Sequence, residues 1–404
     1  MRELRITAVE VLAVRGRRPP RPSGPVQRQS KPLNRYDEHR PPQREPAAPS
    51  VESDSAESDW AESLYLRIGT NGDADGFYGP IDPEAAWPIT NKLAGFLIGM
   101  DPLAGTIVWD KLQRSDRHAR HGYLKMAISA VDNALWDLRG KVFDAPVWQL
   151  LGGPARPRIP AYASTLGTSL EPEAVTEHAR QVAAEGFAGQ KWFLANGPGD
   201  GPAGLELDTE VAERVRAAVG PSAMVMFDAF MGWDLPYATS FARAVEHLRP
   251  AWLEEPFPSS QLISFAELHR RTAVPLSAGE HLYDRAEVLS FLRDGSLGVL
   301  QTDPEWCGGV TELVRICALA EPFGVPVIPH GHGLHAALHV IASQSPDVCP
   351  LAEYLLRHMP VRHHFEASPP VPVAGHFDLP AEPGFGIELD AAKIDRQGTW
   401  PLRD

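Results

Sequence analysis

Three acidic residues recur at equal intervals in the second half of the chain, each at the end of a short apolar run. Asp228 ends AMVMFD, Glu254 lies in AWLEEP and Glu280 ends VPLSAGE, so consecutive acids are 26 residues apart. Carboxylates brought together repel one another unless a cation lies between them, and a ligand set made only of oxygen selects a hard ion such as Mg²⁺. We therefore expect Asp228, Glu254 and Glu280 to hold one Mg²⁺. Glu255 is the alternative to Glu254, but neighbours on a strand face opposite sides, and the equal spacing favours Glu254.

A second group of residues could move a proton. Asp303 ends the run LGVLQTD, and His330 follows VPVIP. A carboxylate that holds one imidazole nitrogen leaves the other nitrogen free to act as a base. The segment HGHGLH also offers His332 and His335, but His330 is preferred because it comes directly after the apolar run. Lys191, in the run GQKWFL, could face a substrate carboxylate, and an exposed lysine is the equal alternative.

The elements that must position these residues form a regular series after residue 158. Eight short β-rich runs are each separated by 23 to 34 residues, which is enough for one strand and one returning helix. The runs are RIPAYAS, GQKWFL, AMVMFDA, AWLEEP, VPLSAGE, LGVLQTD, VPVIPHG and LAEYL. This rhythm predicts an α/β fold, a (β/α)8 TIM-like barrel over residues 151–370. The polar residues fall at the C-terminal ends of the runs, where such a barrel builds its active site.

The first part of the chain follows a different pattern. Strand-like segments at 6–14 and 63–81, followed by helical patterns to about residue 145, predict an N-terminal α+β capping domain over residues 1–150. Within it, residues 17–60 are rich in proline, with nine prolines from Pro19 to Pro49, and predict either a mobile lid or a disordered insert. The segment 371–404 contains no ninth unit, and we expect it to pack back on the capping domain.

Composition excludes several classes of protein. The chain has 404 residues, of which 43% are hydrophobic and 22% charged, as in an ordinary soluble protein. The net charge of −14 and the lack of a basic stripe argue against nucleic-acid binding, and no apolar run is long enough for a membrane span. The N-terminus enters a strand pattern rather than a signal peptide, so we expect a cytoplasmic protein. Three cysteines without paired spacing predict neither disulfides nor a zinc site.

Taken together, these motifs resemble the mandelate racemase subgroup of the enolase superfamily, and within it the L-rhamnonate dehydratases. The resemblance covers nearly the whole chain. Its most specific parts are AVDNALWDLRGK, the three evenly spaced acids, the Asp303 and His330 pair, WCGG at 306–309, VIPHG, and the tail PVPVAGHFDLPAEPGFGIELD. Enolase-superfamily sites combine a Lys or His base with Mg²⁺.

The resemblance implies a hydro-lyase that acts on an acid sugar. The family's metal ligands carry over to Asp228, Glu254 and Glu280, and its dyad to Asp303 and His330, which would remove the proton next to the substrate carboxylate. Its eighth-strand glutamate carries over to Glu353, which would hydrogen-bond the enediolate oxygen. Loss of the β-hydroxyl would then give a 2-keto-3-deoxy sugar acid. A homo-oligomer is also implied.

Departures from the family pattern restrict the reaction and the substrate. Racemases of this subgroup have Lys-x-Lys on the second strand, whereas this chain has Lys191-Trp192-Phe193, so a second base is missing. This favours dehydration; an epimerase or racemase of a hydroxy acid, or a catalytically silent sugar-acid-binding barrel, are the alternatives. We expect Lys191, His281 and His332 to contact the substrate. The substrate-selecting part of the capping domain cannot be aligned, although it contains Arg35, His39 and Arg40, so the sugar stays open.

Overall fold

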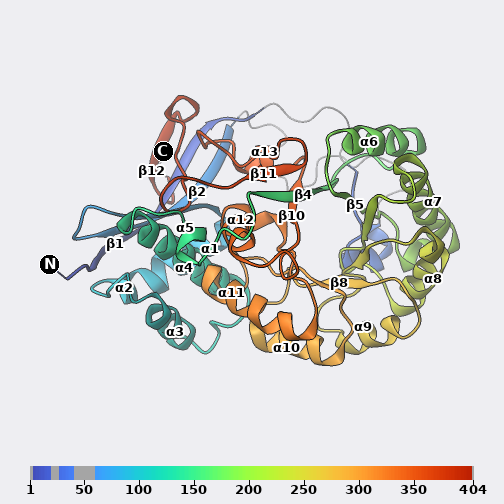
Figure 1. Ribbon diagram of the computed structural model, residues 1–404, viewed down its shortest axis with the longest axis horizontal. Helices are drawn as coiled ribbons and strands as arrows, with labels where there is room; N and C mark the ends of the chain where they lie inside the picture. Colours follow the sequence, from blue (N-terminus) through green and yellow to red (C-terminus); the bar gives the residue numbers. More distant parts are fainter. Residues whose placement is uncertain (1–2, 20–26, 41–59, 403–404) are drawn as a thin grey trace.

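The computed structural model of the chain describes residues 3–19, 27–40 and 60–402. These residues form an antiparallel sheet with its own helices beside a parallel sheet that is ringed by helices (Figure 1). The prediction of a TIM-like barrel with an N-terminal α+β capping domain is therefore confirmed. In the described residues, no helix combines the length and the apolar character needed to cross a bilayer.

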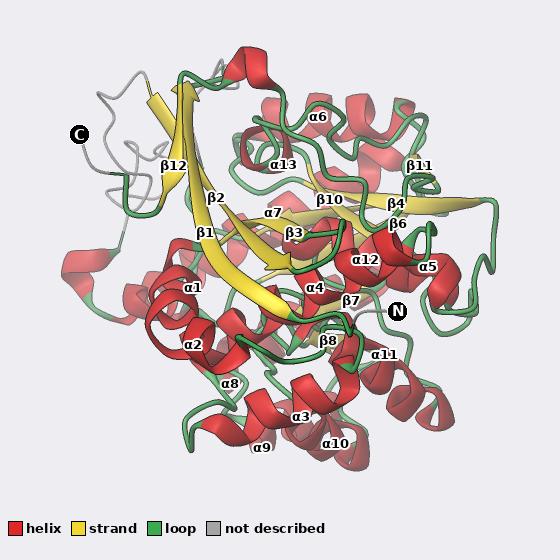
Figure 2. Ribbon diagram, turned by 90° about the vertical axis from the view of Figure 1, so that its left-hand side faces the viewer, coloured by secondary structure: helices red, strands yellow, loops and turns green. Residues whose placement is uncertain are grey.

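The capping sheet has the strand order β12-β1-β2-β3, and its neighbours are antiparallel (Figure 2). Its strands are β1 (Ile6–Arg17), β2 (Trp60–Thr70), β3 (Gly76–Ile81) and β12 (Arg396–Thr399). The C-terminal tail supplies β12, which pairs Thr399 with Leu12 of β1. The helices that follow β3 are α1 (Pro83–Pro88), the π-helical turn Ile89–Leu93, α2 (Ala94–Leu97), α3 (Gly105–Ser115), α4 (Gly122–Val142) and α5 (Val147–Leu150).

The barrel sheet runs in the order β10-β4-β5-β6-β7-β8-β9. Strand β10, which comes last in the chain, pairs with β4, which comes first, and this pairing curls the sheet on itself. Its strands are β4 (Arg158–Ser164), β5 (Gly189–Phe193), β6 (Met224–Asp228), β7 (Trp252–Glu254), β8 (Leu276–Ala278), β9 (Val299–Leu300) and β10 (Ala352–Leu355). The outer helices are α6 (Pro172–Ala184), α7 (Gly201–Val219), α8 (Leu235–Val245), α9 (Leu262–His269), α10 (Arg285–Asp294), α11 (Gly309–Ala320) and α12 (Leu334–Ser343). After β10 come the short helix α13 (Met359–Arg362) and β11 (His376–Asp378), which pairs with β4.

The seventh predicted strand, VPVIPHG, is present only as a short extended segment with one isolated β-bridge. Val327 forms an isolated parallel bridge with Leu300, and its N–H donates to the carbonyl of Val348. Pro326 and Pro329 have no N–H to donate, which explains why a continuous ladder does not form here.

A small apolar cluster fills the inside of the barrel. It consists of buried residues from strands, or segments next to strands, around the barrel: Tyr162, Met226, Trp252, Val299, Ile328 and Leu351. Bulky side chains from several strands make such a barrel a packed core rather than a pore. Polar side chains at the C-terminal ends of the strands therefore lie at the mouth of the barrel.

Helix α4 joins the capping domain to the barrel. Its side chains bind the loop before α11 and the first turn of α11. Asp132 accepts hydrogen bonds from the N–H and hydroxyl of Thr311, and Asn133 accepts from the N–H of Val310 while donating to the carbonyl of Pro304. Gly309 has φ +84°, and a Cβ there would lie 2.4 Å from the Asp132 carboxylate. The second glycine of WCGG is thus required by the close approach of α4.

The described part of the proline-rich segment lies across loops at the barrel mouth. The N–H of Gln27 donates to Gly167, which follows β4, and the N–H of Ser30 donates to Leu194, which follows β5. Two 3-10 turns follow, at Pro32–Arg35 and Asp37–His39. Arg35 forms an ion pair with Asp234 at 3.1 Å, and Arg40 bonds the carbonyl of Gly199. The rest of the predicted lid or insert, residues 20–26 and 41–59, lies outside the described residues.

Replacing Asn133 with alanine should destabilise the protein, because it leaves the carbonyl of Pro304 and the N–H of Val310 buried without a partner. Each unsatisfied buried group costs about 1–3 kcal/mol. The free energy of unfolding, measured by denaturant titration, should fall by about that amount or more. Asn91→Ala removes an exposed asparagine whose side chain, within the described residues, bonds Trp87 of α1 and Thr90 of the adjoining π-helical turn, and it should have a much smaller effect. Equal losses in the two variants would contradict the role of Asn133.

Candidate active site

A buried lysine lies among three carboxylates at the barrel mouth. The Lys191 ammonium is 2.6 Å from Glu254 Oε1, 2.8 Å from Glu353 Oε1 and 3.4 Å from Asp228 Oδ2. Burial alone would lower the pKa of Lys191, but Glu254 and Glu353 hold that pKa well above its ordinary value. The lysine is therefore a fixed positive charge inside the site, and the alternative of an exposed lysine is excluded because its side chain is 1% exposed.

The strand register explains why these acids meet. Asp228 and Glu254 are the last residues of β6 and β7, and they lie opposite each other in the parallel pairing. Burial, followed by repulsion from Glu254, raises the pKa of Asp228 well above its ordinary value. Trp252 Nε1, two residues earlier in β7, donates to Glu254 Oε2 at 3.0 Å, and this bond fixes the carboxylate. Close packing of like charges is thus a property of the strand ends themselves.

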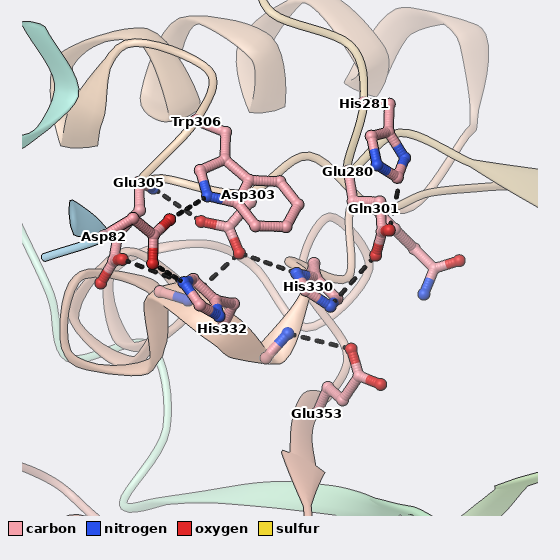
Figure 3. A network of polar contacts seen from close by, with 12 residues as sticks. Asp82, Glu280, His281, Gln301, Asp303, Glu305, Trp306, His330, His332 and Glu353 are labelled. Atoms are coloured by element: carbon pink, nitrogen blue, oxygen red, sulfur yellow. Dashed lines mark hydrogen bonds and ion pairs between the residues drawn. The ribbon is translucent and has the colours of Figure 1, made fainter. Parts of the chain in front are cut away.

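The predicted dyad residues are brought together in the structure (Figure 3). His330 Nδ1 is 2.9 Å from Asp303 Oδ2, and His330 Nε2 is 3.0 Å from Glu280 Oε2. The backbone N–H groups of Glu305 and Gly333 donate to Asp303, so this carboxylate cannot easily turn away. Burial disfavours the charged imidazole, but Glu280 and Asp303 raise the pKa of His330 to about 10. The pair can therefore hold a proton at Nε2.

Glu280 and Glu353 flank the imidazole from neighbouring elements. Burial raises the pKa of Glu280 to about 7, against the opposing effect of His330. Glu353 lies in β10, and its Oε2 accepts the N–H of Gly331 at 2.9 Å. Burial also disfavours ionisation of Glu353, but Lys191 and His330 lower its pKa to about 2. Glu353 thus connects the lysine cluster to the histidine.

Glu255 also reaches the site, although strand alternation argues against it. Strand β7 ends at Glu254, and Glu255 has φ +36°, so the chain turns and both side chains are buried at the mouth. Glu255 Oε2 is 2.9 Å from His281 Nδ1. Against the effect of burial, the hydrogen bond that His281 donates to Glu255 raises the pKa of His281 to about 9. Two consecutive glutamates at a strand end are the only sequence signal for this residue.

The other two histidines of HGHGLH have different partners. His332 Nε2 is 2.7 Å from Asp82 Oδ1 of the capping domain, and His335 Nε2 is 2.9 Å from Glu366 Oε2. The strand pattern assigns no role to Asp82 or to the indole of Trp306, although Trp306 begins the WCGG motif. The Trp306 ring lies beside both His330 and His332, with centroid distances of 5.2 and 5.1 Å. The contacts of Asp82 and Trp306 become visible only in three dimensions.

Among the described residues, three groups bring histidine and carboxylate atoms within 4.8 Å of one another, close enough to share a metal ion. They are Glu255, Glu280 and His281; Asp82, Glu305 and His332; and His335, His363 and Glu366. The predicted triad of Asp228, Glu254 and Glu280 is not one of them, because Lys191 lies against Asp228 and Glu254 while Glu280 bonds His330. The triad residues nevertheless interact electrostatically, since Glu254 and Glu280 both raise the pKa of Asp228.

Comparison with known proteins places this site in a family. Residues 174–393 match "Enolase C-terminal domain-like", and residues 44–152 match "Mandelate racemase / muconate lactonizing enzyme, N-terminal domain". The chain is 35% identical over 314 residues to L-rhamnonate dehydratase of Saccharopolyspora erythraea, covering 76% of this chain and 77% of that protein.

Solved structures give the same assignment. L-rhamnonate dehydratase from Gibberella zeae superposes with a TM-score of 0.82 at 28% identity, covering 97% of this chain and 95% of that one. The same enzyme complexed with Mg superposes with a TM-score of 0.81 at 27% identity, covering 97% and 96%. The curated relative is a hydro-lyase by name, and the resemblance inferred from the sequence motifs is confirmed. This chain belongs to the enolase superfamily, with the N- and C-terminal domains of the mandelate racemase and muconate lactonizing enzyme family.

Proposed function

We propose that this protein is a Mg²⁺-dependent acid-sugar dehydratase that removes the proton next to a sugar carboxylate and eliminates the β-hydroxyl. The observation that carries the proposal is the pair of Asp303 with His330, together with the lack of a second basic side chain at position 193. On the second strand, where a second base would lie, Phe193 is buried with its ring 5.3 Å from the Lys191 ammonium. A phenyl ring cannot accept or donate a proton. Racemisation, which removes a proton from one face of the α-carbon and returns one to the other face, therefore lacks its second base, whereas elimination needs only one base.

The donor set at the strand ends fits a hard divalent cation. Asp228, Glu254 and Glu280 offer only carboxylate oxygens, all three are buried, and Lys191 supplies one positive charge against their three negative charges. Oxygen ligands of this kind suit Mg²⁺. A bound Mg²⁺ would withdraw charge from the substrate carboxylate and so make the neighbouring proton more acidic.

The chain's own residues would perform the remaining steps. With Glu280 bound to the cation instead of to His330, His330 Nε2 would take the α-proton while Asp303 holds Nδ1. The carbon–hydrogen electron pair would then form a double bond between the α-carbon and the carboxylate carbon, and a carboxylate oxygen would gain the charge. Lys191, which is held by Glu353, would stabilise the oxygen that gains charge. The carbon–oxygen bond at the β-carbon then breaks, and the departing hydroxyl takes a proton to leave as water. His281, held through Nδ1 by Glu255, is the residue we assign to that proton or to substrate binding.

The first test is a substrate screen. The purified chain with Mg²⁺ should release 2-keto products, detected as semicarbazones, from at least one acid in a library of aldonic and aldaric acids. Silence across the library would contradict the proposal. Solvent deuterium appearing at the α-carbon without loss of water would show an epimerase instead, and binding without either reaction would show a silent sugar-acid-binding barrel.

His330→Asn should reduce kcat by about 10²- to 10⁴-fold, the usual contribution of a general base, because asparagine cannot accept the α-proton. The melting temperature should stay close to that of the native chain. His335→Asn is the matched control: it removes a buried histidine of the same segment that pairs with Glu366 outside the catalytic pair, so it should lower stability and leave kcat nearly unchanged. Normal turnover by the His330 variant would disprove its role as the base.

Mg²⁺ should raise the melting temperature of the native chain, because a ligand that binds only the folded state stabilises it, by about 2.7 kcal/mol when its concentration is 100 times Kd. Asp228→Asn and Glu254→Gln should lose this shift. Asp303→Asn should keep it while losing turnover, since Asp303 bonds His330 rather than the triad. A full Mg²⁺ shift in the Asp228 and Glu254 variants would exclude these ligands.

A further inference from the structure

The indole of Trp306 lies against several imidazoles at the barrel mouth. Its ring centroid is 5.2 Å from that of His330, 5.1 Å from His332 and 5.9 Å from His281. Trp306 belongs to the loop between Asp303 and α11, and its backbone N–H donates to the backbone carbonyl of Asp303. Whatever fixes this indole therefore also determines what lies against the face of His330.

Asp82 holds the indole from the capping domain (Figure 3). Its Oδ2 accepts the Nε1–H of Trp306 at 3.0 Å, and its Oδ1 lies 2.7 Å from His332 Nε2. Arg362 adds a contact to Oδ1 at 3.2 Å and also bonds Glu305. Burial opposes ionisation of Asp82, but His332 and Arg362 hold its pKa well below the ordinary range. Both carboxylate oxygens are thus acceptors that point to the barrel.

The position of Asp82 in its own domain makes these contacts unusual. Asp82 is the N-cap residue of α1, where an aspartate normally accepts an N–H from the first turn of the helix. Here its side chain makes no such capping bond and instead reaches across to the barrel. Asp234 and Asp284, at the corresponding positions of α8 and α10, do cap their helices. The side chain of Asp82 is therefore used for the site rather than for its helix.

The contacts have a direct consequence for the histidine. Asp303 fixes His330 in the plane of its ring through Nδ1, but a hydrogen bond in that plane leaves the tilt of the ring free. The Trp306 ring packs against His330 at an interplanar angle of 36° and limits that tilt. Trp306 cannot turn away without breaking its bond to Asp82.

We propose that Asp82 is a positioning residue: by holding Trp306 and His332 together, it fixes the indole against His330, so that the base is oriented by both domains. The kinetic part of this inference rests on the proposed function, in which His330 takes the α-proton. Loss of Asp82 should then lower the rate of proton removal more than substrate binding, because a misplacement of about 1 Å can cost about 10²-fold in rate.

The test compares Asp82→Ala and Asp82→Asn in the full chain. Asp82→Ala should lower kcat by about 10- to 100-fold with KM changed by no more than about twofold. Asparagine offers one acceptor oxygen instead of two, so Asp82→Asn should give an intermediate loss. In chain labelled with 5-fluorotryptophan, the ¹⁹F resonance of Trp306, assigned by its absence in Trp306→Phe, should shift or broaden in Asp82→Ala.

Asp137→Asn is the matched control. Asp137 is a buried aspartate of the capping domain that accepts the N–H groups of Phe77 and Phe385 and pairs with Lys141. In the described part of the chain, none of its hydrogen bonds or ion pairs involves Trp306 or His332. It should lower the melting temperature while leaving the Trp306 resonance and kcat unchanged. An unchanged Trp306 resonance in Asp82→Ala, or a kcat loss no larger than in Asp137→Asn, would overturn the inference.

A measurement without substrate separates this inference from the proposed function. The ¹⁵N signals of the His330 ring, assigned by their loss in His330→Asn, should move in Asp82→Ala and stay in place in Asp137→Asn. If the native chain dehydrates no acid sugar, the proposed function fails, and the Trp306 and His330 signals still decide whether Asp82 positions the ring. Signals that do not move would overturn the inference in that case as well.

Discussion

The site is built around an excess of buried negative charge. Asp228 and Glu254 end their strands, Glu280 follows β8 and Glu353 lies within β10. In the described part of the chain, these carboxylates are contacted by Lys191, His330 and His281. An unpaired buried charge destabilises the folded state, and removing one member of an ion pair leaves the other buried without a partner. This explains why Lys191 contacts three carboxylates at once and why His330 contacts two. It also explains why Asp228 and Glu280 have raised pKa values, and it is the charge that the proposed Mg²⁺ would neutralise.

Much of this arrangement is visible in the sequence because it follows from local pattern. Asp228, Glu254 and Asp303 each follow a short β-rich run, and a parallel barrel brings the C-terminal ends of its strands to one mouth. Lys191, within the second run, reaches the same cluster. The choice of His330 over His332 and His335 rests on the same logic, since only His330 contacts Asp303 through its ring.

Other parts depend on geometry that strand periodicity does not contain. Alternation places Glu255 away from Glu254, but β7 ends at Glu254 and the positive φ of Glu255 turns the next side chain inward. The seventh predicted strand is shorter than its apolar run because Pro326 and Pro329 cannot extend the ladder. Asp82 is 224 residues away from Trp306, so its contact follows only from how the two domains pack.

The capping domain holds the loop of residues 303–311 at several points. Asp82 bonds Trp306, Asn133 bonds Pro304 and Val310, and Asp132 bonds Thr311. This loop begins with Asp303, which receives the N–H of Glu305 and orients His330. Because a loop is rigid only where its backbone and side chains have partners, a barrel without the cap would keep the acids at its strand ends but lose the support beside the proposed base, His330. The two domains therefore form one catalytic unit, in which the barrel supplies the charges and the cap holds the loop that carries Asp303.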